Sequence, residues 1–301
     1  MALAPTSRRR WLAACMLMSA SALPAWAADA AWPSKPIRIL VGFPGGSTPD
    51  IAARALADAM AKATDDHTLG VVINGNLTSA KQLNPRLPYD PAKDFSLISL
   101  LATAPLVLVA PADLPTGAAF LAAARAAGDK WSYGSVGIGS VGHLGMELVK
   151  AAIGNLLPVH IPYSGNPAVL TAMIGGQIQM ALVPPGIALP QVKAGKLHAI
   201  GLAGPRSTLA PDVAPLADLG LKMTALEVWT ALVGPAGMSK SALERLSREV
   251  PALVRDAELR QRLFNGGWEA QGSSPEGLAA RVKDEARILG EIITARGIKL
   301  E

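Results

Sequence analysis

Three glycine-containing loops carry most of the residues whose types and spacing could bind a ligand. The first loop spans residues 43–50 and follows a predicted strand. Gly45 and Gly46 would let the backbone approach a ligand closely. Thr48 is typical of a helix N-cap, and Asp50 suits the positive end of the helix dipole. The amide groups at this helix start could bind an anion, although a tight turn between strand and helix explains the same residues equally well.

The second loop contains the pattern G-x-G-x-x-G over residues 137–142, between a predicted strand and a predicted helix. A dinucleotide site of this type needs an acidic residue at the end of the next strand. That strand ends His160-Ile161-Pro162-Tyr163 and offers no carboxylate, which argues against a nicotinamide cofactor. The same loop could instead present backbone amides, together with the hydroxyls of Ser135 and Ser140, to a carboxylate.

The third loop begins at Tyr163 and continues through Gly165 and Pro167 into another predicted helix. Tyr163 could form the wall of a pocket or could be a core residue whose hydroxyl is hydrogen-bonded. The four histidines are scattered along the chain without a metal-ligand spacing, so the sequence predicts no metal site.

A catalytic interpretation of the same residues also stands. Ser135 or Ser140 could act as a nucleophile with His143 as its base, which would make the protein a serine hydrolase. No G-x-S-x-G motif surrounds either serine. His143 is explained as well by packing at the start of a helix.

The elements that must position these loops alternate between short aliphatic strands and alanine-rich helices, and this alternation predicts parallel α/β architecture. Ser274, Pro275 and Gly297 mark the start and end of a long C-terminal helix. Trp229 and Trp268 are predicted to be core residues. The predicted strands are residues 37–42, 69–73, 106–110, 131–135, 159–162, 178–183 and 197–203, and the predicted helices are residues 50–63, 118–127, 144–153, 168–174, 189–194, 242–254 and 275–296.

The N-terminus reads as an export signal. Arg8, Arg9 and Arg10 precede an apolar stretch that ends at the sequence Ala25-Trp26-Ala27. Cleavage is therefore expected after Ala27, which also removes the single cysteine, Cys15. The general secretory route is the favoured interpretation, and the arginine pair leaves the twin-arginine route open.

Composition excludes several classes of protein. Half of the 301 residues are apolar and 17% are charged, which is typical of a folded globular chain rather than a disordered one. Residues 1–27 contain three arginines and no acidic residue, so without them the net charge falls from +5 to +2. No basic block remains in the mature chain, and a nucleic-acid partner is not expected.

Several ordered motifs resemble the periplasmic solute-binding receptors of tripartite tricarboxylate transporters, the Bug-type receptors. The resemblance covers nearly all of the mature chain. It rests on Trp32-Pro33-Ser34-Lys35-Pro36-Ile37-Arg38, Phe43-Pro44-Gly45-Gly46 with Asp50, Lys93-Asp94-Phe95, Tyr133-Gly134-Ser135 with Gly137, Gly139, Ser140 and His143, Pro162-Tyr163-Ser164-Gly165, Gly175-Gly176-Gln177, Lys193-Ala194-Gly195-Lys196-Leu197 and Pro235-Ala236-Gly237.

The resemblance implies a periplasmic-binding-protein-like clamp of two α/β domains. Domain one would comprise residues 28–103 and 226–301, and domain two residues 104–225. A small di- or tricarboxylate would be enclosed between them, held by amides, hydroxyls and water, with no cofactor, no metal and no catalysis. The ligand-binding residues would be Phe43, Gly45, Gly46, Ser47, Thr48, Asp50, Ser135, Gly139, Ser140, His143, Tyr163, Gly165, Pro167 and Ala168.

Partners implied by the resemblance are the membrane subunits of such a transporter, with a sensor kinase as an alternative, and the receptor itself would be a monomer. The chain departs from the family pattern in two places. Residues 180–185, Met-Ala-Leu-Val-Pro-Pro, replace a wall that is often polar. Roughly twenty-five residues, one strand and its loop, are also missing after Met60, judged against an ordinary βαβ unit and the family pattern. The missing strand would have lain at a sheet edge beside the first strand, so its loss should expose that edge.

Overall fold

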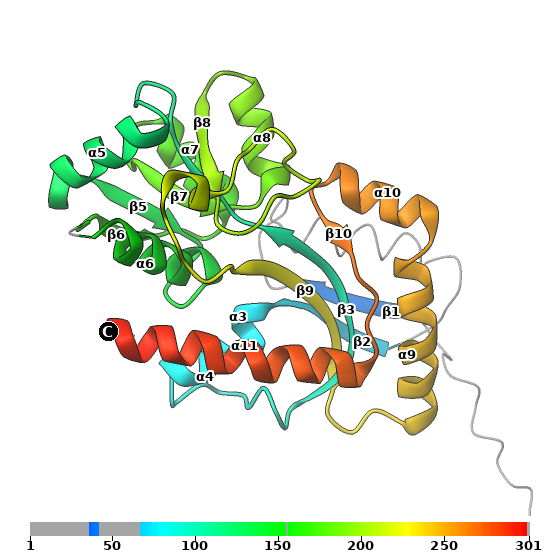
Figure 1. The fold of residues 1–301 in the computed structure, drawn as a ribbon. Coiled ribbons are helices and arrows are strands. Elements are labelled where there is room, and N and C mark those ends of the chain that lie inside the picture. Colours follow the sequence, from blue (N-terminus) through cyan, green and yellow to red (C-terminus); the bar gives the residue numbers. More distant parts are fainter. Residues whose placement is uncertain (1–35, 42–66, 155, 300–301) are drawn as a thin grey trace, which may run out of the picture.

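The fold consists of two β-sheets, each covered by helices on both faces (Figure 1). This computed structural model describes residues 36–41, 67–154 and 156–299. We call the sheet that contains the first strand, with its helices, lobe one, and we call the other sheet, with its helices, lobe two. The predicted helix of residues 50–63 lies outside the described residues.

Lobe one is built from segments near both ends of the chain. Its strands lie in the order β1-β2-β9-β3-β10. Helices α9 and α10 pack on one face around Leu246 and Trp268. Helices α3 and α11 pack on the other face around Trp229 and Leu278. The bounds are β1 Ile37–Val41, β2 His67–Ile73, α3 Asn74–Leu77, α4 Ser79–Leu83, β3 Phe95–Pro105, β9 Glu227–Pro235, α9 Lys240–Val254, α10 Ala257–Asn265, β10 Glu269–Ala270 and α11 Pro275–Arg296.

Lobe two comes from the middle of the chain, and its strands lie in the order β6-β5-β7-β4-β8. Phe120 from α5 and Leu144 from α6 belong to the core on one face of the sheet. Val169 and Met173 from α7 and Ala188 from α8 belong to the core on the other face. The bounds are β4 Val107–Pro111, α5 Gly117–Ala127, β5 Ser132–Ser135, α6 Val141–Ile153, β6 Val159–Pro162, α7 Asn166–Ile174, β7 Met180–Val183, α8 Pro185–Lys193 and β8 Leu197–Leu202, followed by a 3-10 turn at Leu216–Leu219.

The prediction of parallel sheets is wrong for part of each sheet. Strand β1 is parallel to β2, and β5 is parallel to β6 and β7. Strand β9 is antiparallel to β2 and β3, and β4 is antiparallel to β7 and β8. Two successive strands of one sheet are parallel when a helix between them carries the chain back to the end of the sheet where the first strand began. Strands β4 and β9 are instead entered from the other lobe, so no crossover helix sets their direction.

Strand β3 was not predicted, because it is contiguous with another strand. Only Leu106 separates the end of β3 at Pro105 from the start of β4 at Val107. The aliphatic residues continue across this point, but the chain passes there from lobe one to lobe two. A single apolar run therefore contains strands of two different sheets, and apolar pattern alone does not show the break.

The C-terminal helix matches its predicted limits and reaches both lobes. Ser274 caps α11 by accepting a hydrogen bond from the amide of Gly277, and Gly297 ends it in a left-handed conformation. Leu278, near its start, belongs to the core of lobe one. Leu289 and Ile293, near its end, belong to the core of lobe two. The helix therefore ties the two lobes together (Figure 1).

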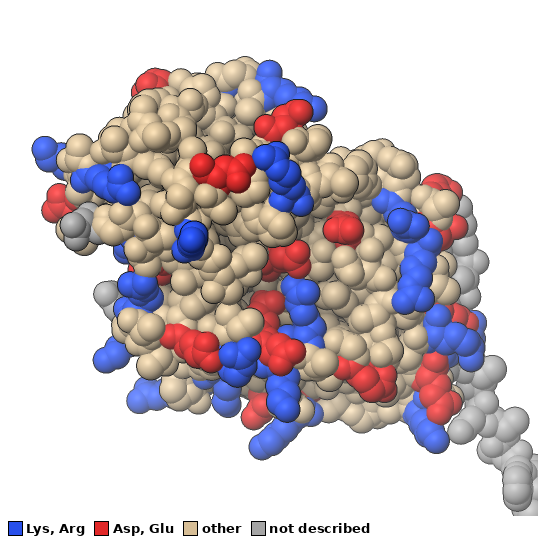
Figure 2. Space-filling view, viewed as in Figure 1, with Lys and Arg blue, Asp and Glu red and all other residues tan. Residues whose placement is uncertain are grey.

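The charge distribution on the surface and the lengths of the apolar helices indicate which kinds of partner the protein can bind. On the face drawn in Figure 2, Lys and Arg side chains are interspersed with Asp and Glu, so this face offers no continuous positive track. Opposite charges also pair along α11, as Arg287 does with Glu291 at 2.9 Å. No helix in the described part of the chain is long and apolar enough to cross a membrane.

Candidate functional site

Two of the three predicted loops come together at one edge of the lobe-two sheet. Strands β5 and β6 are parallel neighbours, so their carboxyl ends lie side by side. The loop from β5 to α6 carries Ser135 and Gly139, and the loop from β6 to α7 begins at Tyr163. The two loops are joined directly, because the amide of Tyr163 donates to the carbonyl of Ser135 at 2.8 Å.

The predicted residues of the first loop cannot be placed in this arrangement. Phe43, Gly45, Gly46, Ser47, Thr48 and Asp50 lie outside the described residues. The geometry below therefore concerns the contribution of lobe two and the part of lobe one that touches it.

The serine hydroxyls are engaged within the β5–α6 loop. Ser140 caps α6, accepting from the amide of His143 at 3.3 Å and donating to the carbonyl of Gly137 at 2.7 Å. Ser135 accepts from the amide of Gly137 at 3.1 Å. The first two amides of α6, those of Val141 and Gly142, have no acceptor within the described residues. Backbone amides at a helix start, rather than serine hydroxyls, are therefore the groups this loop offers to an anion.

The β6–α7 loop offers a second helix start and one aromatic hydroxyl. Tyr163 is half-buried and packs against the lobe-two core. Gly165 is the N-cap residue of α7, and Pro167 lies in its first turn. The amide of Ala168 is already used, donating to the carbonyl of Gly165 at 3.1 Å. Tyr163 supplies the aromatic hydroxyl of this loop.

A cluster of aromatic and charged side chains from β5, β6 and α6 packs next to the β5–α6 loop. Tyr133 is fully buried, and its ring stacks on the ring of His160, its partner on the neighbouring strand, with centroids 4.9 Å apart. The rings of His143 and His160 lie 4.2 Å apart. Glu147, one turn beyond His143 on α6, accepts hydrogen bonds from the Tyr133 hydroxyl and from Lys150, both at 2.7 Å.

This cluster holds both histidines neutral. Burial, with smaller contributions from the neighbouring His143 and Lys150, lowers the pKa of His160 to about 4, while Glu147 opposes the shift. Burial also lowers the pKa of His143, partly offset by Glu147. Burial by itself would raise the pKa of Glu147, but the hydrogen bonds from Lys150 and Tyr133 outweigh it and lower that pKa. Burial, together with the bond to Glu147, raises the pKa of the Tyr133 hydroxyl.

Glu147, Lys150 and His160 were missed as members of the site. The sequence does contain a signal, because Glu147 and Lys150 lie one and two turns after His143 and so share a helix face with it. The partnership of Tyr133 with His160 depends on strand register, which the sequence does not show.

The serine–histidine pair of the hydrolase interpretation is arranged differently from the prediction. The ring in contact with Ser135 is that of His160, whose Nε2 lies 2.7 Å from the Ser135 hydroxyl oxygen. His143 Nδ1 instead accepts from the amide of Gly139 at 3.2 Å. Ser135 is 2% exposed. A nucleophile must reach its substrate, so this burial disfavours catalysis by Ser135 in this conformation.

Gly139 lies against lobe one instead of lining open space. The Ser79 hydroxyl donates to its carbonyl at 2.8 Å, in a buried contact. A Cβ built on Gly139 would overlap Cδ1 of Leu83, and its φ of +80° favours glycine. The sequence predicted that Gly139 lets the backbone approach a ligand closely. In the structure, the absence of a side chain at Gly139 also allows lobe two to pack against α4.

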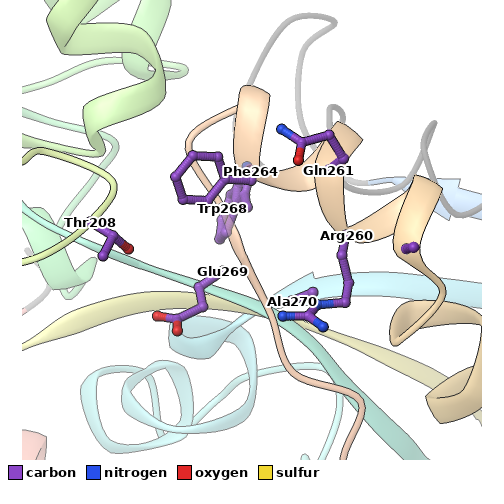
Figure 3. A pocket seen from close by; sticks show the side chains of 8 residues that line it. Thr208, Arg260, Gln261, Phe264, Trp268, Glu269 and Ala270 are labelled. Atoms are coloured by element: carbon purple, nitrogen blue, oxygen red, sulfur yellow. The ribbon is translucent and has the colours of Figure 1, made fainter.

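The described residues also line pockets elsewhere. One pocket of about 390 Å³ lies where lobe two meets α10 and β10 (Figure 3). Its lining residues are Thr208, Ala257, Arg260, Gln261, Phe264, Trp268, Glu269 and Ala270. None of them was predicted as a site residue. Trp268 is 1% exposed and Trp229 fully buried, as predicted for core residues.

The described residues contain no group of side chains that could form a metal centre. No three His, Cys, Asp or Glu side chains there lie close enough together to hold an ion.

Comparison with known proteins points to one family. Residues 49–298 match the model of the tripartite tricarboxylate transporter family receptor. A UPF0065 protein from the tcbD–tcbE intergenic region of Pseudomonas sp. strain P51 is 31% identical over 314 residues, which cover 94% of this chain and 93% of that protein. Because the alignment is longer than the 301 residues of this chain, the relative has residues that this chain lacks.

Solved structures agree in fold. A periplasmic transporter is 28% identical with a TM-score of 0.82, and the match covers 90% of this chain and all of that one. MatC of Rhodopseudomonas palustris, solved with bound malate, is 25% identical with a TM-score of 0.78, and the match covers 87% of this chain and all of that one.

Proposed function

Because this chain belongs to the tripartite tricarboxylate transporter receptor family, we propose that it captures a small di- or tricarboxylate between its two lobes and hands it to a transporter. The receptors of this family bind solutes. The finer points, namely the class of ligand, the residues that bind it and the membrane partner, are our proposal.

The observation that carries the proposal is the meeting of two helix starts at the carboxyl ends of β5 and β6. The amides of Val141 and Gly142 at the start of α6 are unpaired among the described residues, and Tyr163 lies on the adjoining loop. Helix starts stabilise anions through their amides and dipole, so a carboxylate could bind here without an arginine. The malate bound to the similar MatC supports this ligand class.

We propose the binding residues and domain limits given by the sequence. Ser135, Gly139, Ser140, His143, Tyr163, Gly165, Pro167 and Ala168 would form the lobe-two side, and Phe43, Gly45, Gly46, Ser47, Thr48 and Asp50 the lobe-one side. Domain one would comprise residues 28–103 and 226–301, and domain two residues 104–225. Ser135, Ser140 and His143 would act by shaping the loop, because their side chains are engaged inside lobe two.

We also propose that the protein is exported, cleaved after Ala27 and monomeric, and that it works in the periplasm with transporter membrane subunits. A role as the ligand sensor of a kinase is the alternative, since both roles need the same ligand capture.

The direct test is a thermal-shift screen with malate, adipate and citrate, followed by calorimetry. A ligand present at one hundred times its Kd stabilises the folded state by about 2.7 kcal/mol, a shift that is readily measured. We expect at least one of these acids to bind and its neutral amide not to bind. Failure of all three acids to bind would overturn the proposal.

Two variants sharpen this test. Tyr163→Phe should weaken binding of the selected acid about threefold to tenfold, the loss expected for one hydrogen bond, with little change in melting temperature. Tyr89→Phe is the matched control, because the Tyr89 hydroxyl donates to the carbonyl of Asn76 within lobe one. Esterase turnover that disappears in Ser135→Ala would instead support the hydrolase.

A further inference from the structure

The β5–α6 loop is held from both lobes at one residue, Gly139. Its amide donates to Nδ1 of His143 within lobe two, at 3.2 Å. Its carbonyl accepts from the hydroxyl of Ser79 in lobe one, at 2.8 Å. One peptide segment is thus bonded on each side to a different lobe.

The surface that receives Gly139 on lobe one is shaped for it. Gly75 of α3 and Ser79 and Leu83 of α4 all approach Gly139. A Cβ on Gly75 would lie 3.9 Å from the carbonyl oxygen of Gly139, and one on Gly139 would overlap Leu83. Ser79 is 1% exposed, so a hydroxyl without its acceptor there would lose a hydrogen bond that water could not easily replace.

The lobe-two side of this contact depends on the chemical state of His143. Only an unprotonated Nδ1 can accept a hydrogen bond from the amide of Gly139. Tyr133, His160, Glu147 and Lys150 are the titratable groups around that ring, from β5, β6 and α6. Burial lowers the pKa of His143, which keeps the ring in the accepting form at neutral pH.

We propose that Ser79 and His143 are positioning residues that act together through Gly139, and that this contact fixes the ligand-binding loop relative to lobe one. We call these three residues the interlobe clasp. The part of the inference that concerns ligand affinity rests on the proposed function. Neither side chain needs to touch the ligand, since a displaced loop would misplace the amides of α6.

The first measurement concerns the clasp itself and needs no ligand. Hydrogen exchange of peptides covering residues 136–142 should be faster in Ser79→Ala than in the wild-type protein. Thr78→Val is the matched control, because Thr78 is also buried, is adjacent in sequence and donates to the carbonyl of Asn74 within lobe one. Exchange in Thr78→Val should stay at the wild-type rate, and equal acceleration in both variants would overturn the proposal.

The second measurement asks whether the two residues act as a unit. His143→Leu removes the acceptor for the Gly139 amide, whereas the side-chain oxygen of His143→Asn can replace Nδ1. We expect faster exchange in His143→Leu, near-normal exchange in His143→Asn, and no further acceleration when Ser79→Ala and His143→Leu are combined. A merely structural histidine would give additive effects and no rescue by asparagine.

The third measurement is malate affinity by calorimetry, with adipate and citrate in parallel. Ser79→Ala and His143→Leu should each weaken binding about threefold to tenfold, and His143→Asn should restore it. If exchange follows the clasp but none of the three acids binds, the clasp stands and the proposed function fails. If an acid binds with unchanged affinity in every variant, the clasp has no role in binding and our inference is wrong.

Discussion

A single buried carboxylate holds the strand through which the chain returns from lobe two to lobe one. Glu285 on α11 accepts from the Asn74 side chain at 2.7 Å and from the Trp229 indole at 2.5 Å. Asn74 also donates to the carbonyl of Glu227, the first residue of β9. Burial raises the pKa of Glu285, while these donors and Arg281 act to lower it.

Removal of this acceptor should destabilise the protein. Glu285→Leu removes the acceptor of the Trp229 indole and one of the two acceptors of the Asn74 side chain, and we expect a loss of about 2–4 kcal/mol of unfolding free energy. Glu285→Gln should cost less, because one oxygen remains to accept. Urea denaturation measures both. Glu291→Gln, in an exposed ion pair on the same helix, should change stability by less than about 0.5 kcal/mol.

The lowered pKa of His160 predicts that the folded protein loses stability in acid. Its pKa is about 4 in the folded protein and near 6.5 in an unfolded chain, chiefly because of burial. The unfolded state therefore binds a proton first as the pH falls. Stability from the neutral ring is complete above about pH 6.5 and is lost progressively as the pH falls towards 4. Denaturation at several pH values should show this decline.

His160→Gln provides the comparison for the pH series. Its amide can reach Ser135 but does not titrate, so stability should vary less between pH 6.5 and 4. An unchanged slope would assign the acid sensitivity to other groups.

Among the elements, helix α8 makes an unusually close approach to lobe one. A Cβ on Gly186, in the first turn of α8, would overlap the carbonyl oxygen of Gly266, which follows α10. Because both partners there are backbone, neither can move aside cheaply. The contact between Gly186 and Gly266 therefore depends on a glycine, as the interlobe clasp depends on Gly139.

Gly186→Ala tests this contact. Alanine normally favours a helix over glycine by about 1 kcal/mol, but here the overlap should prevail and lower the melting temperature. Gly204→Ala is the control, because a Cβ there meets only Ala225 at an ordinary 3.5 Å. Equal melting temperatures for the two variants would mean that α8 and the turn after α10 can separate without cost.

The described sheet of lobe one ends at strand β1. In the strand order this strand has a neighbour only in β2, and Leu40 is 55% exposed. An edge strand with an exposed aliphatic side chain favours association between copies. This position is where the missing strand was expected from the sequence, and the segment around Met60 itself lies outside the described residues.

A charge at this edge should therefore reduce association. Leu40→Lys should remain monomeric at concentrations where the wild-type protein begins to associate, as measured by light scattering. Ile174→Lys changes an equally large exposed side chain at the end of a helix and should have no such effect. Association that persists in Leu40→Lys would place the contact elsewhere.

Elements whose limits are encoded locally could be predicted from the amino-acid sequence. Ser274, Pro275 and Gly297 mark the two ends of α11, because caps depend on residues within one turn. The strand at Val159–Pro162 and the loops around Gly139 and Gly165 were predictable for the same reason. Family motifs along the chain were enough to indicate the receptor family.

Contacts between residues that are far apart in the sequence become visible only in the folded structure. The bond between Ser79 and Gly139 joins residues sixty positions apart, and that between Asn74 and Glu285 joins residues 211 apart. The direction of β4 and β9 and the use of glycine at Gly186 follow from how the two lobes pack, and the contact of Ser135 with His160 follows from the pairing of β5 with β6 inside lobe two. Local sequence carries no record of such pairings, because strand register and lobe contacts are set by the burial of the whole core.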